Sequence, residues 1–221
     1  MEILMTWVIG DVHGEKELFL KLLDRIAMEN AGKEDEIYSV GDIIDRGNNS
    51  LDCIDICIDK GIKVVKGNHE DMCLDFYFME NRYSEGIWYT NGGDKTNNEF
   101  YYIIKLANKE NKEELQAKID KYISWMRSLP YYYLLENKYL ICHGGIKGNL
   151  KLNCTGDAPD ILWRRKDIRS NDYFQIVGHS PREKPLITSD YANIDTGSFY
   201  SGNLTAIHLP SLKTITVSDY R

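Results

Sequence analysis

A chain of 221 residues with an apolar share of 43% can bury a sizeable core, which suits one larger α/β domain better than two small ones. Its formal net charge of −7 argues against a nucleic-acid or anionic-membrane partner, because such partners need a basic surface. An anionic substrate stays possible, since bound cations can reverse the local field. No stretch approaches transmembrane length, residues 1–9 lack the basic region of a signal peptide, and five cysteines without a C-x-x-C pair fit reduced thiols, so we expect a cytoplasmic protein.

The first third of the chain alternates short apolar runs with amphipathic stretches. We expect strands over residues 3–9, 36–40 and 62–66, and helices over residues 15–30 and 50–60. Ser50 suits the N-cap of the second helix, and Gly61 suits the position after its last turn. This alternation indicates βαβ units around a parallel or mixed sheet. Because binding loops of such sheets lie outside the carboxyl ends of the strands, the polar loops after these strands should converge.

The alternation breaks between residues 70 and 130, which we interpret as a helical insert packed beside the sheet of a single domain, residues 1–221. Helices are expected over 71–79 and 113–128, with a turn at Asn91-Gly92-Gly93 between them. Strands resume at 131–135, 139–142 and 174–177. The runs 191–194, 204–209 and 214–218 predict a closing antiparallel set.

The densest group of charges follows the second expected strand, in the residues Gly-Asp-Ile-Ile-Asp-Arg-Gly at 41–47. Alone, this motif could be a solvated loop that contains an Asp–Arg pair. Four further motifs repeat its chemistry after other apolar runs: Asp-Val-His-Gly (11–14), Gly-Asn-His-Glu (67–70), His-Gly-Gly (143–145) and Gly-His-Ser (178–180). Four of the five histidines lie in these motifs, a distribution that packing alone explains poorly.

The residue types in these motifs favour metal binding. Asp11 and His13 are two residues apart, so in extended backbone both side chains can reach one ion. Asp42 could bridge two ions through its two oxygens. The other candidate ligands are Asn68, His143 and His179. Mixed nitrogen and oxygen ligands suit Mn, Fe or Zn better than Mg or Ca, and two such ions would activate a bridging water and hold an in-line phosphoryl displacement.

In this order, the five motifs resemble those of the calcineurin-like metallophosphoesterases, and Asp45-Arg46 narrows the resemblance to the phosphoprotein phosphatase branch. Residues 88–93, Trp163-x-Arg165, residues 194–197 and residues 202–205 resemble the bacteriophage lambda type of that branch and its bacterial relatives. The similarity covers nearly the whole chain. It implies an α/β fold in which a metallophosphatase-type β-sandwich is flanked by helices, an α-β-β-α arrangement with a helical insert.

The resemblance also implies roles. Asp11, His13 and Asp42 would hold a first divalent ion, and Asp42, Asn68, His143 and His179 a second, with Mn expected first and Fe or Zn as alternatives. His69 would be the general acid for the leaving oxygen, with Asp45 orienting it, and Arg46 and Arg165 would bind phosphate oxygens. These roles agree with the chemistry of the residues, since His titrates near neutral pH and Arg presents a planar fork to phosphate.

The implied function is that of a serine/threonine protein phosphatase, which hydrolyses phosphomonoesters by attack of a metal-bridging hydroxide. Its partner would be a phosphorylated protein or a small phosphoester. One alternative is a hydrolase of symmetrical dinucleoside tetraphosphates. Another is a catalytically inactive interaction module, which should have lost ligands that this sequence keeps. Asp195 is interpreted as a turn residue or a residue behind the ligands, His208 as structural, and Arg164 as a solvated charge. Phosphotyrosine activity and the oligomeric state stay open.

Overall fold

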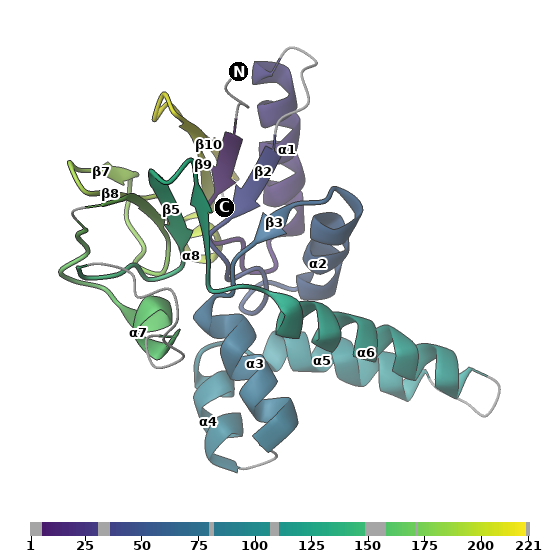
Figure 1. The fold of residues 1–221 in the computed structure, drawn as a ribbon. Helices are drawn as coiled ribbons and strands as arrows, with labels where there is room; N and C mark the ends of the chain where they lie inside the picture. Colours follow the sequence, from purple (N-terminus) through teal and green to yellow (C-terminus); the bar gives the residue numbers. More distant parts are fainter. Residues whose placement is uncertain are drawn as a thin grey trace.

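The computed structural model describes residues 6–30, 36–79, 82–106, 111–148, 158–170 and 172–219. Two five-stranded sheets pack against each other, and helices cover their outer faces (Figure 1). The first sheet has the order β10-β9-β1-β2-β3, and the second has the order β4-β5-β6-β8-β7. The expected α/β sandwich is therefore confirmed.

The first sheet joins the two ends of the described chain. It consists of β1 (Thr6–Ile9), β2 (Glu36–Ser39), β3 (Lys63–Val64), β9 (Asn203–Leu209) and β10 (Thr214–Ser218). The strands β1, β2 and β3 pair in parallel, as the βαβ pattern predicted, whereas β9 pairs antiparallel to both β1 and β10. The helices α1 (Lys16–Glu29) and α2 (Ser50–Asp59) connect the parallel strands.

The second sheet consists of β4 (Tyr132–Leu135), β5 (Tyr139–Cys142), β6 (Phe174–Val177), β7 (Leu186–Ile187) and β8 (Tyr191–Asn193). The expectation that residues 191–194 close an antiparallel set with residues 204–218 is wrong. Strand β8 instead pairs in parallel with β6 and antiparallel with the short strand β7. An apolar run identifies a strand, but a run this short does not specify which sheet it joins.

The insert consists of α3 (Asn68–Met79), α4 (Arg82–Thr90), α5 (Asp94–Lys105) and α6 (Lys112–Ser128). Its helices lie beyond the carboxyl ends of β2 and β3, on one side of the sandwich (Figure 1). The turn at residues 91–93 is confirmed, since it separates α4 from α5. These two helices were not predicted, and residues 94–98, Asp-Lys-Thr-Asn-Asn, have weak helix propensity. Two shorter helices, α7 (Ala158–Trp163) and α8 (Ser198–Ser201), complete the described elements.

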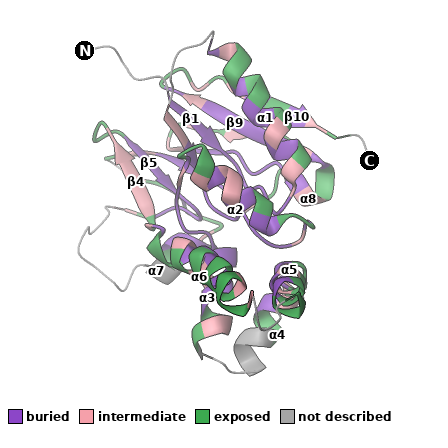
Figure 2. Ribbon diagram, turned by 90° about the vertical axis from the view of Figure 1, so that its right-hand side faces the viewer, coloured by how far each residue is buried: buried purple, intermediate pink, exposed green. Residues whose placement is uncertain are grey.

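Three apolar clusters hold these layers together. One contains Val8, Ile141 and Ile207 and lies between the two sheets. A second joins the outer face of the first sheet to α1, α2 and the insert, and a third joins the second sheet to α7. Figure 2 shows the strands β1, β5 and β9 largely buried and α1 and α2 exposed on their outer sides. The sheets thus form a rigid frame for the loops at their ends.

The N-terminus of α2 differs from the expectation. Its N-cap is Asn49, whose side chain makes no capping bond, whereas the Ser50 hydroxyl accepts a bond from the backbone N–H of Asp45 at 3.0 Å. The carboxylate of Glu99, from α5, accepts the N–H groups of Ser50 and Leu51 instead. Gly61 has φ +63° directly after the C-cap, as predicted. A side chain of the insert therefore caps α2, one of the helices that flank the first sheet.

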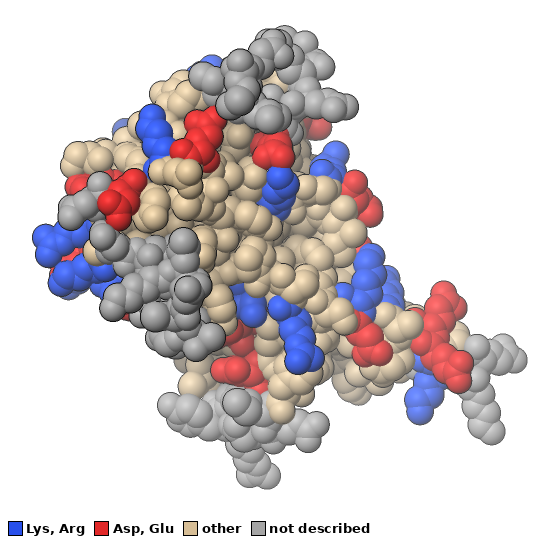
Figure 3. Space-filling view, in the orientation of Figure 1, with Lys and Arg blue, Asp and Glu red and all other residues tan. Residues whose placement is uncertain are grey.

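Three further features are the polarity of the helices, the state of the cysteines and the distribution of surface charge. Within the described ranges, every helix is too short or too polar to cross a membrane. The four cysteines of these ranges, Cys53, Cys57, Cys73 and Cys142, are free and buried, and Cys154 lies outside the described residues. Acidic and basic side chains are interspersed over the face drawn in Figure 3.

Candidate active site

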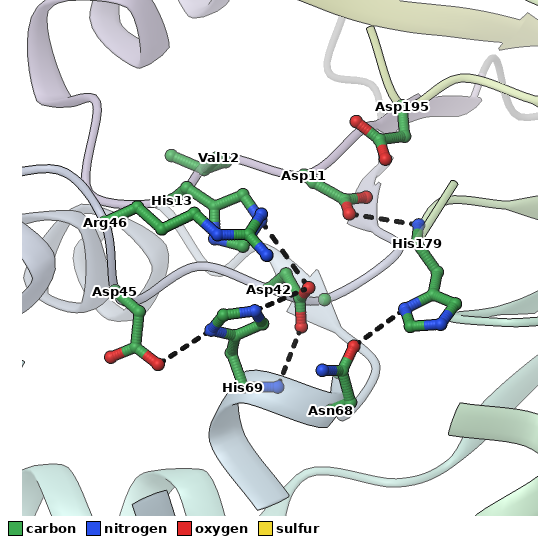
Figure 4. Close-up of polar contacts among 12 residues, drawn as sticks. Asp11, Val12, His13, Asp42, Asp45, Arg46, Asn68, His69, His179 and Asp195 are labelled. Carbon is green, nitrogen blue, oxygen red and sulfur yellow. Dashed lines mark hydrogen bonds and ion pairs between the residues drawn. The ribbon is translucent and has the colours of Figure 1, made fainter. Parts of the chain in front are cut away.

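The motif loops converge at the carboxyl ends of the parallel strands of both sheets. Asp11 and His13 follow β1, residues 42–46 follow β2, Asn68 and His69 follow β3, His143 follows β5, and His179 follows β6. The close-up in Figure 4 shows most of these side chains directed toward one another. All eight predicted carboxylate, amide and imidazole residues are buried, the most exposed being His179 at 4%. The expected convergence is confirmed.

Asp42 lies at the centre of this arrangement. Two groups of possible ligands share it: His13, Asp42 and His69, and Asp42, His143 and His179, with the donor atoms of each group within 4.8 Å of one another. Its Oδ2 lies 3.3 Å from His143 Nε2 and 3.6 Å from His13 Nε2. Although burial acts in the opposite direction, the imidazoles of His143, His69 and His13 lower the pKa of Asp42 well below its ordinary value. Asp42 is therefore a carboxylate that faces two ligand groups at once.

The second group has an arrangement that favours a cation or a proton. His143 Nδ1 donates to the Val40 carbonyl at 2.7 Å, and its Nε2 lies 2.9 Å from Asn68 Oδ1. His179 Nδ1 lies 2.8 Å from the same Asn68 oxygen, and its buried Nε2 has no hydrogen-bond partner. Because His143 Nε2 faces the oxygens of Asn68 and Asp42, a positive charge at this point is stabilised. Two imidazoles, an amide oxygen and a carboxylate fit a divalent ion such as Mn, Fe or Zn.

Asp11 lies beside His179 (Figure 4). Its Oδ2 accepts the backbone N–H of His179 at 3.0 Å, whereas its buried Oδ1 has no hydrogen-bond partner. Burial and the nearby carboxylates of Asp195 and Asp42 raise the pKa of Asp11 well above its ordinary value. An unpaired buried carboxylate oxygen is costly, so Asp11 also fits a cation. Asp195 is buried beside Asp11, and it accepts the Gly197 N–H, which agrees with the turn role expected for it (Figure 4).

His13 is oriented by its other ring nitrogen. Its Nδ1 donates to the Ile44 carbonyl at 3.0 Å, which leaves the Nε2 lone pair directed into the site. In the structure, Arg46 Nη1 donates to this Nε2 at 2.5 Å. Arg46 must therefore give up this bond when His13 binds a cation through Nε2.

His69 and Asp45 form a buried pair. His69 Nδ1 lies 2.7 Å from Asp45 Oδ2, and the His69 ring reaches toward Asp42, with Nε2 3.9 Å from Asp42 Oδ2. The structure thus joins the predicted acid to its predicted orienting carboxylate (Figure 4). His69 also lies in one of the two possible ligand groups, but its bond to Asp45 distinguishes it from His13.

The two predicted phosphate-binding arginines lie on opposite sides of the site. Arg46 contacts His13, and its guanidinium carbon lies 5.3 Å from the centre of the Tyr200 ring. Arg165 Nη1 donates to the His179 carbonyl at 2.5 Å, so its side chain is directed toward the ligand group. Arg164 instead forms an ion pair with Asp160, and its side chain is only 18% exposed, so the expectation of a solvated charge is wrong. The two neighbouring arginines therefore have different directions, as the predicted role of Arg165 requires.

Glu70 holds the Asp42 loop, a role that its motif did not predict. Its carboxylate is fully buried and accepts the backbone N–H groups of Asp42, Ile43 and Gly67 at 2.8–3.0 Å, with a fourth from Ile44 at 3.4 Å. The signal was its place in the motif Gly-Asn-His-Glu, where the residue adjoins two predicted site residues. Glu70 supports the loop that carries the shared carboxylate.

The backbone of the site is strained at its functional residues. Five of the nine described non-glycine residues with positive φ are His13, Asp42, Asp45, Arg46 and His179. Each such conformation costs on the order of 1–3 kcal/mol and persists only where the surroundings impose it. The surroundings of Asp42 are tightly packed, since a Cβ atom at Gly67 would lie only 2.1 Å from Asp42 Oδ1.

Comparison with known proteins places these observations in context. The family model for calcineurin-like phosphoesterases matches residues 4–207. Serine/threonine-protein phosphatase 2 of Escherichia coli is 31% identical over 214 residues, which cover 90% of each chain. Serine/threonine-protein phosphatase 1 of Salmonella typhimurium is 27% identical, covering 90% of this chain and 89% of its own. An asymmetrical bis(5′-nucleosyl)-tetraphosphatase of Anoxybacillus flavithermus is 29% identical, covering 95% of this chain and 92% of its own.

Solved structures share the fold at lower identity. A putative diadenosine tetraphosphatase superposes with a TM-score of 0.67 at 15% identity, covering 98% of this chain and 94% of its own. A serine/threonine phosphatase from Saccharomyces cerevisiae superposes with a TM-score of 0.59 at 15% identity, covering 99% of this chain and 81% of its own. These similarities support the same two-sheet architecture.

Proposed function

Because the chain belongs to the calcineurin-like phosphoesterases, we propose that it is a metal-dependent phosphomonoesterase that acts on phosphoserine and phosphothreonine in proteins. The observation that carries this proposal is Asp42, a buried carboxylate shared by two groups of possible ligands. A site built around one shared carboxylate fits two divalent ions.

The proposed ligands come from the family motifs, and the geometry supports part of each set: His13 and Asp42 lie in one group of possible ligands, together with His69, and Asp42, His143 and His179 lie in the other. Asp11, His13 and Asp42 would hold one ion, and Asp42, Asn68, His143 and His179 the other. Two bound divalent ions would neutralise the buried carboxylates and lower the pKa of a water held between them. We propose Mn as the first candidate, with Fe or Zn as alternatives, because nitrogen and oxygen ligands are mixed. A reducing cytoplasm suits the four buried free cysteines.

The chain's own residues would bind the phosphate and supply a proton. Arg46 and Arg165 would hold phosphate oxygens from opposite sides through charge-assisted hydrogen bonds. His69 would donate a proton to the leaving oxygen from Nε2, since its Nδ1 is bonded to the Asp45 carboxylate. Asp45 would hold the ring in this orientation and stabilise its protonated form.

A second function is favoured by two of the similarities. The relative at 29% identity and the structure with a TM-score of 0.67 carry names of dinucleoside or diadenosine tetraphosphate hydrolases. Hydrolysis of a dinucleoside tetraphosphate would use the same phosphate-binding and acid groups. The symmetrical reaction gives two nucleoside diphosphates, whereas the asymmetrical reaction gives a triphosphate and a monophosphate.

A side-by-side assay tests the proposal. Chelator-treated protein would be reloaded with Mn and given phosphoserine, phosphothreonine and phosphotyrosine peptides and diadenosine tetraphosphate. We expect the highest kcat/KM on the phosphoserine and phosphothreonine peptides, no activity before Mn is added, and two ions per chain by elemental analysis. The Asp42→Asn protein, purified in parallel, controls for contaminating phosphatases. A higher kcat/KM on the tetraphosphate would select the second function, and its products would identify the reaction.

A further inference from the structure

We propose that Trp88 and Thr96, two residues of the helical insert, are positioning residues that fix the Asp45 carboxylate and through it the acid His69. This inference rests on the acid role of His69 in the proposed function. It gives the insert a task in the reaction beyond covering the sheet.

Asp45 needs support from outside its own loop. The residue is fully buried and has φ +73°, a left-handed conformation that a residue with a Cβ rarely adopts. The next residue, Arg46, has φ +69° as well. Two consecutive strained residues persist only when neighbouring groups hold them.

The insert contacts both carboxylate oxygens of Asp45. Trp88 Nε1 donates to Asp45 Oδ2 at 2.7 Å, the same oxygen that bonds His69. The Thr96 hydroxyl donates to Asp45 Oδ1 at 2.6 Å, and it lies 3.1 Å from the Asp45 backbone nitrogen, whose N–H it accepts. The two bonds fix the plane of the carboxylate. Because His69 Nδ1 bonds to this carboxylate, a fixed carboxylate also fixes the direction in which His69 Nε2 points.

The turn between α4 and α5 also holds Arg46. The Gly92 carbonyl accepts the Arg46 backbone N–H at 3.0 Å, and a Cβ on Gly92 would lie 2.8 Å from Arg46 Cγ. A Cβ on Gly93 would lie 2.3 Å from Trp88 Nε1, so the indole occupies its place only because residue 93 is glycine. One turn of the insert therefore supports the orienting carboxylate and the phosphate-binding arginine together.

A purely structural role is the competing explanation. A buried tryptophan requires some acceptor for its N–H, and a buried threonine requires partners for its hydroxyl. Backbone carbonyls would satisfy both side chains equally well, so neither side chain requires Asp45 as its acceptor. Two residues that lie eight positions apart in the insert nevertheless both donate to the carboxylate that bonds His69. A structural role predicts equal losses on all substrates, whereas a positioning role predicts losses that depend on the leaving group.

The experiment compares leaving groups in matched variants. Thr96→Val is nearly isosteric and removes the hydroxyl, Thr96→Ser keeps it, and Trp88→Phe removes the indole N–H. Trp125→Phe is the control, because Trp125 packs partly buried against the same apolar cluster from α6. Each Mn-loaded enzyme is assayed on a phosphoserine peptide, whose alkoxide needs a proton, and on 4-nitrophenyl phosphate, whose leaving group needs little help.

We expect Thr96→Val and Trp88→Phe to lower kcat on the phosphoserine peptide by roughly 10- to 100-fold, the weight of one hydrogen bond to a charged group. The loss on the aryl phosphate should be only about threefold, because proton donation contributes little there. Thr96→Ser should restore the peptide rate, Trp125→Phe should leave the ratio of the two rates unchanged, and every variant should bind two ions.

Equal losses on both substrates in Thr96→Val and Trp88→Phe would overturn the inference in favour of a structural role. His69→Asn provides the reference. If His69→Asn loses more rate on the phosphoserine peptide than on the aryl phosphate and the two insert variants do not, the inference alone fails. If His69→Asn loses rate equally on both, the acid role fails and takes the inference with it. Should Trp88→Phe not fold, the isosteric Thr96→Val decides.

Discussion

The two halves of the site are held by different parts of the molecule. The ligand half, with Asp42, Asn68, His143 and His179, comes directly from strand ends, and its supports lie in the same motifs. Glu70 is one example, since it follows His69 and holds the Asp42 loop. The acid half, with Asp45 and Arg46, lies between β2 and α2, and its supports come from α4, α5 and the turn between them.

If the proposed roles hold, metal binding and proton donation depend on different supports within one small site. The strand ends hold the proposed ligands through the rigidity of the sheets, whereas the acid half depends on side chains 43 and 51 positions further along the chain. Variants of the ligand half should lose ions, and variants of the acid half should keep them.

Asp42→Asn should give the largest loss, because it removes the one carboxylate that faces both ligand groups. We expect occupancy of both ions to fall and kcat/KM to drop by about 10³-fold or more, since charge stabilisation by ions at the reacting group is worth several kcal/mol. Asn68→Ala is the comparison, because Asn68 contacts only the second group, and it should lose less. Elemental analysis that finds two ions in an active Asp42→Asn protein would refute the shared role.

His69→Asn should show the opposite pattern. It should keep both ions and lose roughly 10²–10⁴-fold in kcat on alkyl phosphates, the usual contribution of general acid catalysis. The loss should be smaller on an activated aryl phosphate. Metal content is measured in the same preparation. If the variant lost an ion, His69 would be a ligand, as its place in the group with His13 and Asp42 also allows.

The convergence of the proposed ligands could be predicted from the sequence almost completely, and the surroundings of the proposed acid only in part. Asp11, His13, Asp42, Asn68, His143 and His179 each follow an apolar run within a short motif, and parallel strands bring such positions together. Asp45 and His69 were also identified from their motifs. The partners Trp88 and Thr96 were not, because α4 and α5 contain residues of low helix propensity such as Gly86 and Asn97, and local propensity says nothing of contacts over 43 and 51 positions.

Because local sequence does not specify distant partners, the pairing of residues 191–194 was also predicted wrongly. Residues 191–194 have the apolar pattern of a strand, but their partners are set by packing between the sheets, where Ala192 and Ile194 are fully buried. The role of Ser50 was mistaken for a related reason. A serine before a helix suits an N-cap, yet here its hydroxyl serves the strained Asp45 backbone.

Glu70→Gln should weaken the ligand half without touching a ligand. An amide in place of the carboxylate directs its own N–H groups at backbone N–H groups, so the Asp42 loop loses two or more of its bonds. We expect the metal affinity to fall about 10- to 100-fold, the usual effect of groups that support a ligand, and Tm to fall by roughly 4–12 °C. Isothermal titration with Mn and thermal unfolding measure the two effects.

Glu99→Gln is the matched control for this prediction. Glu99 also accepts backbone N–H groups, those of Ser50 and Leu51, but at the start of α2. It should cost about 0.5–2 kcal/mol of stability, as the loss of a helix cap does, and leave the metal affinity unchanged. Equal metal affinities in Glu70→Gln and the unchanged protein would show that the Asp42 loop holds its shape without Glu70.

The smallest effect should separate the two adjacent arginines. Arg165 is exposed, yet its Nη1 donates to the His179 carbonyl, so its guanidinium lies at the edge of the site. Arg164 pairs with Asp160 on α7 and has no contact of this kind in the described structure. Arg165→Ala should therefore raise KM and lower kcat/KM about 10-fold, the loss of one charge-assisted contact of roughly 1.5 kcal/mol at an exposed position. Arg164→Ala should change both constants by less than about twofold, since its guanidinium pairs with Asp160 and not with a group of the proposed site. Both variants should bind two ions, because neither arginine is a ligand. Steady-state kinetics on one phosphopeptide decides between them: if Arg164→Ala is the impaired enzyme, the second phosphate-binding residue has been assigned one position too far along the chain.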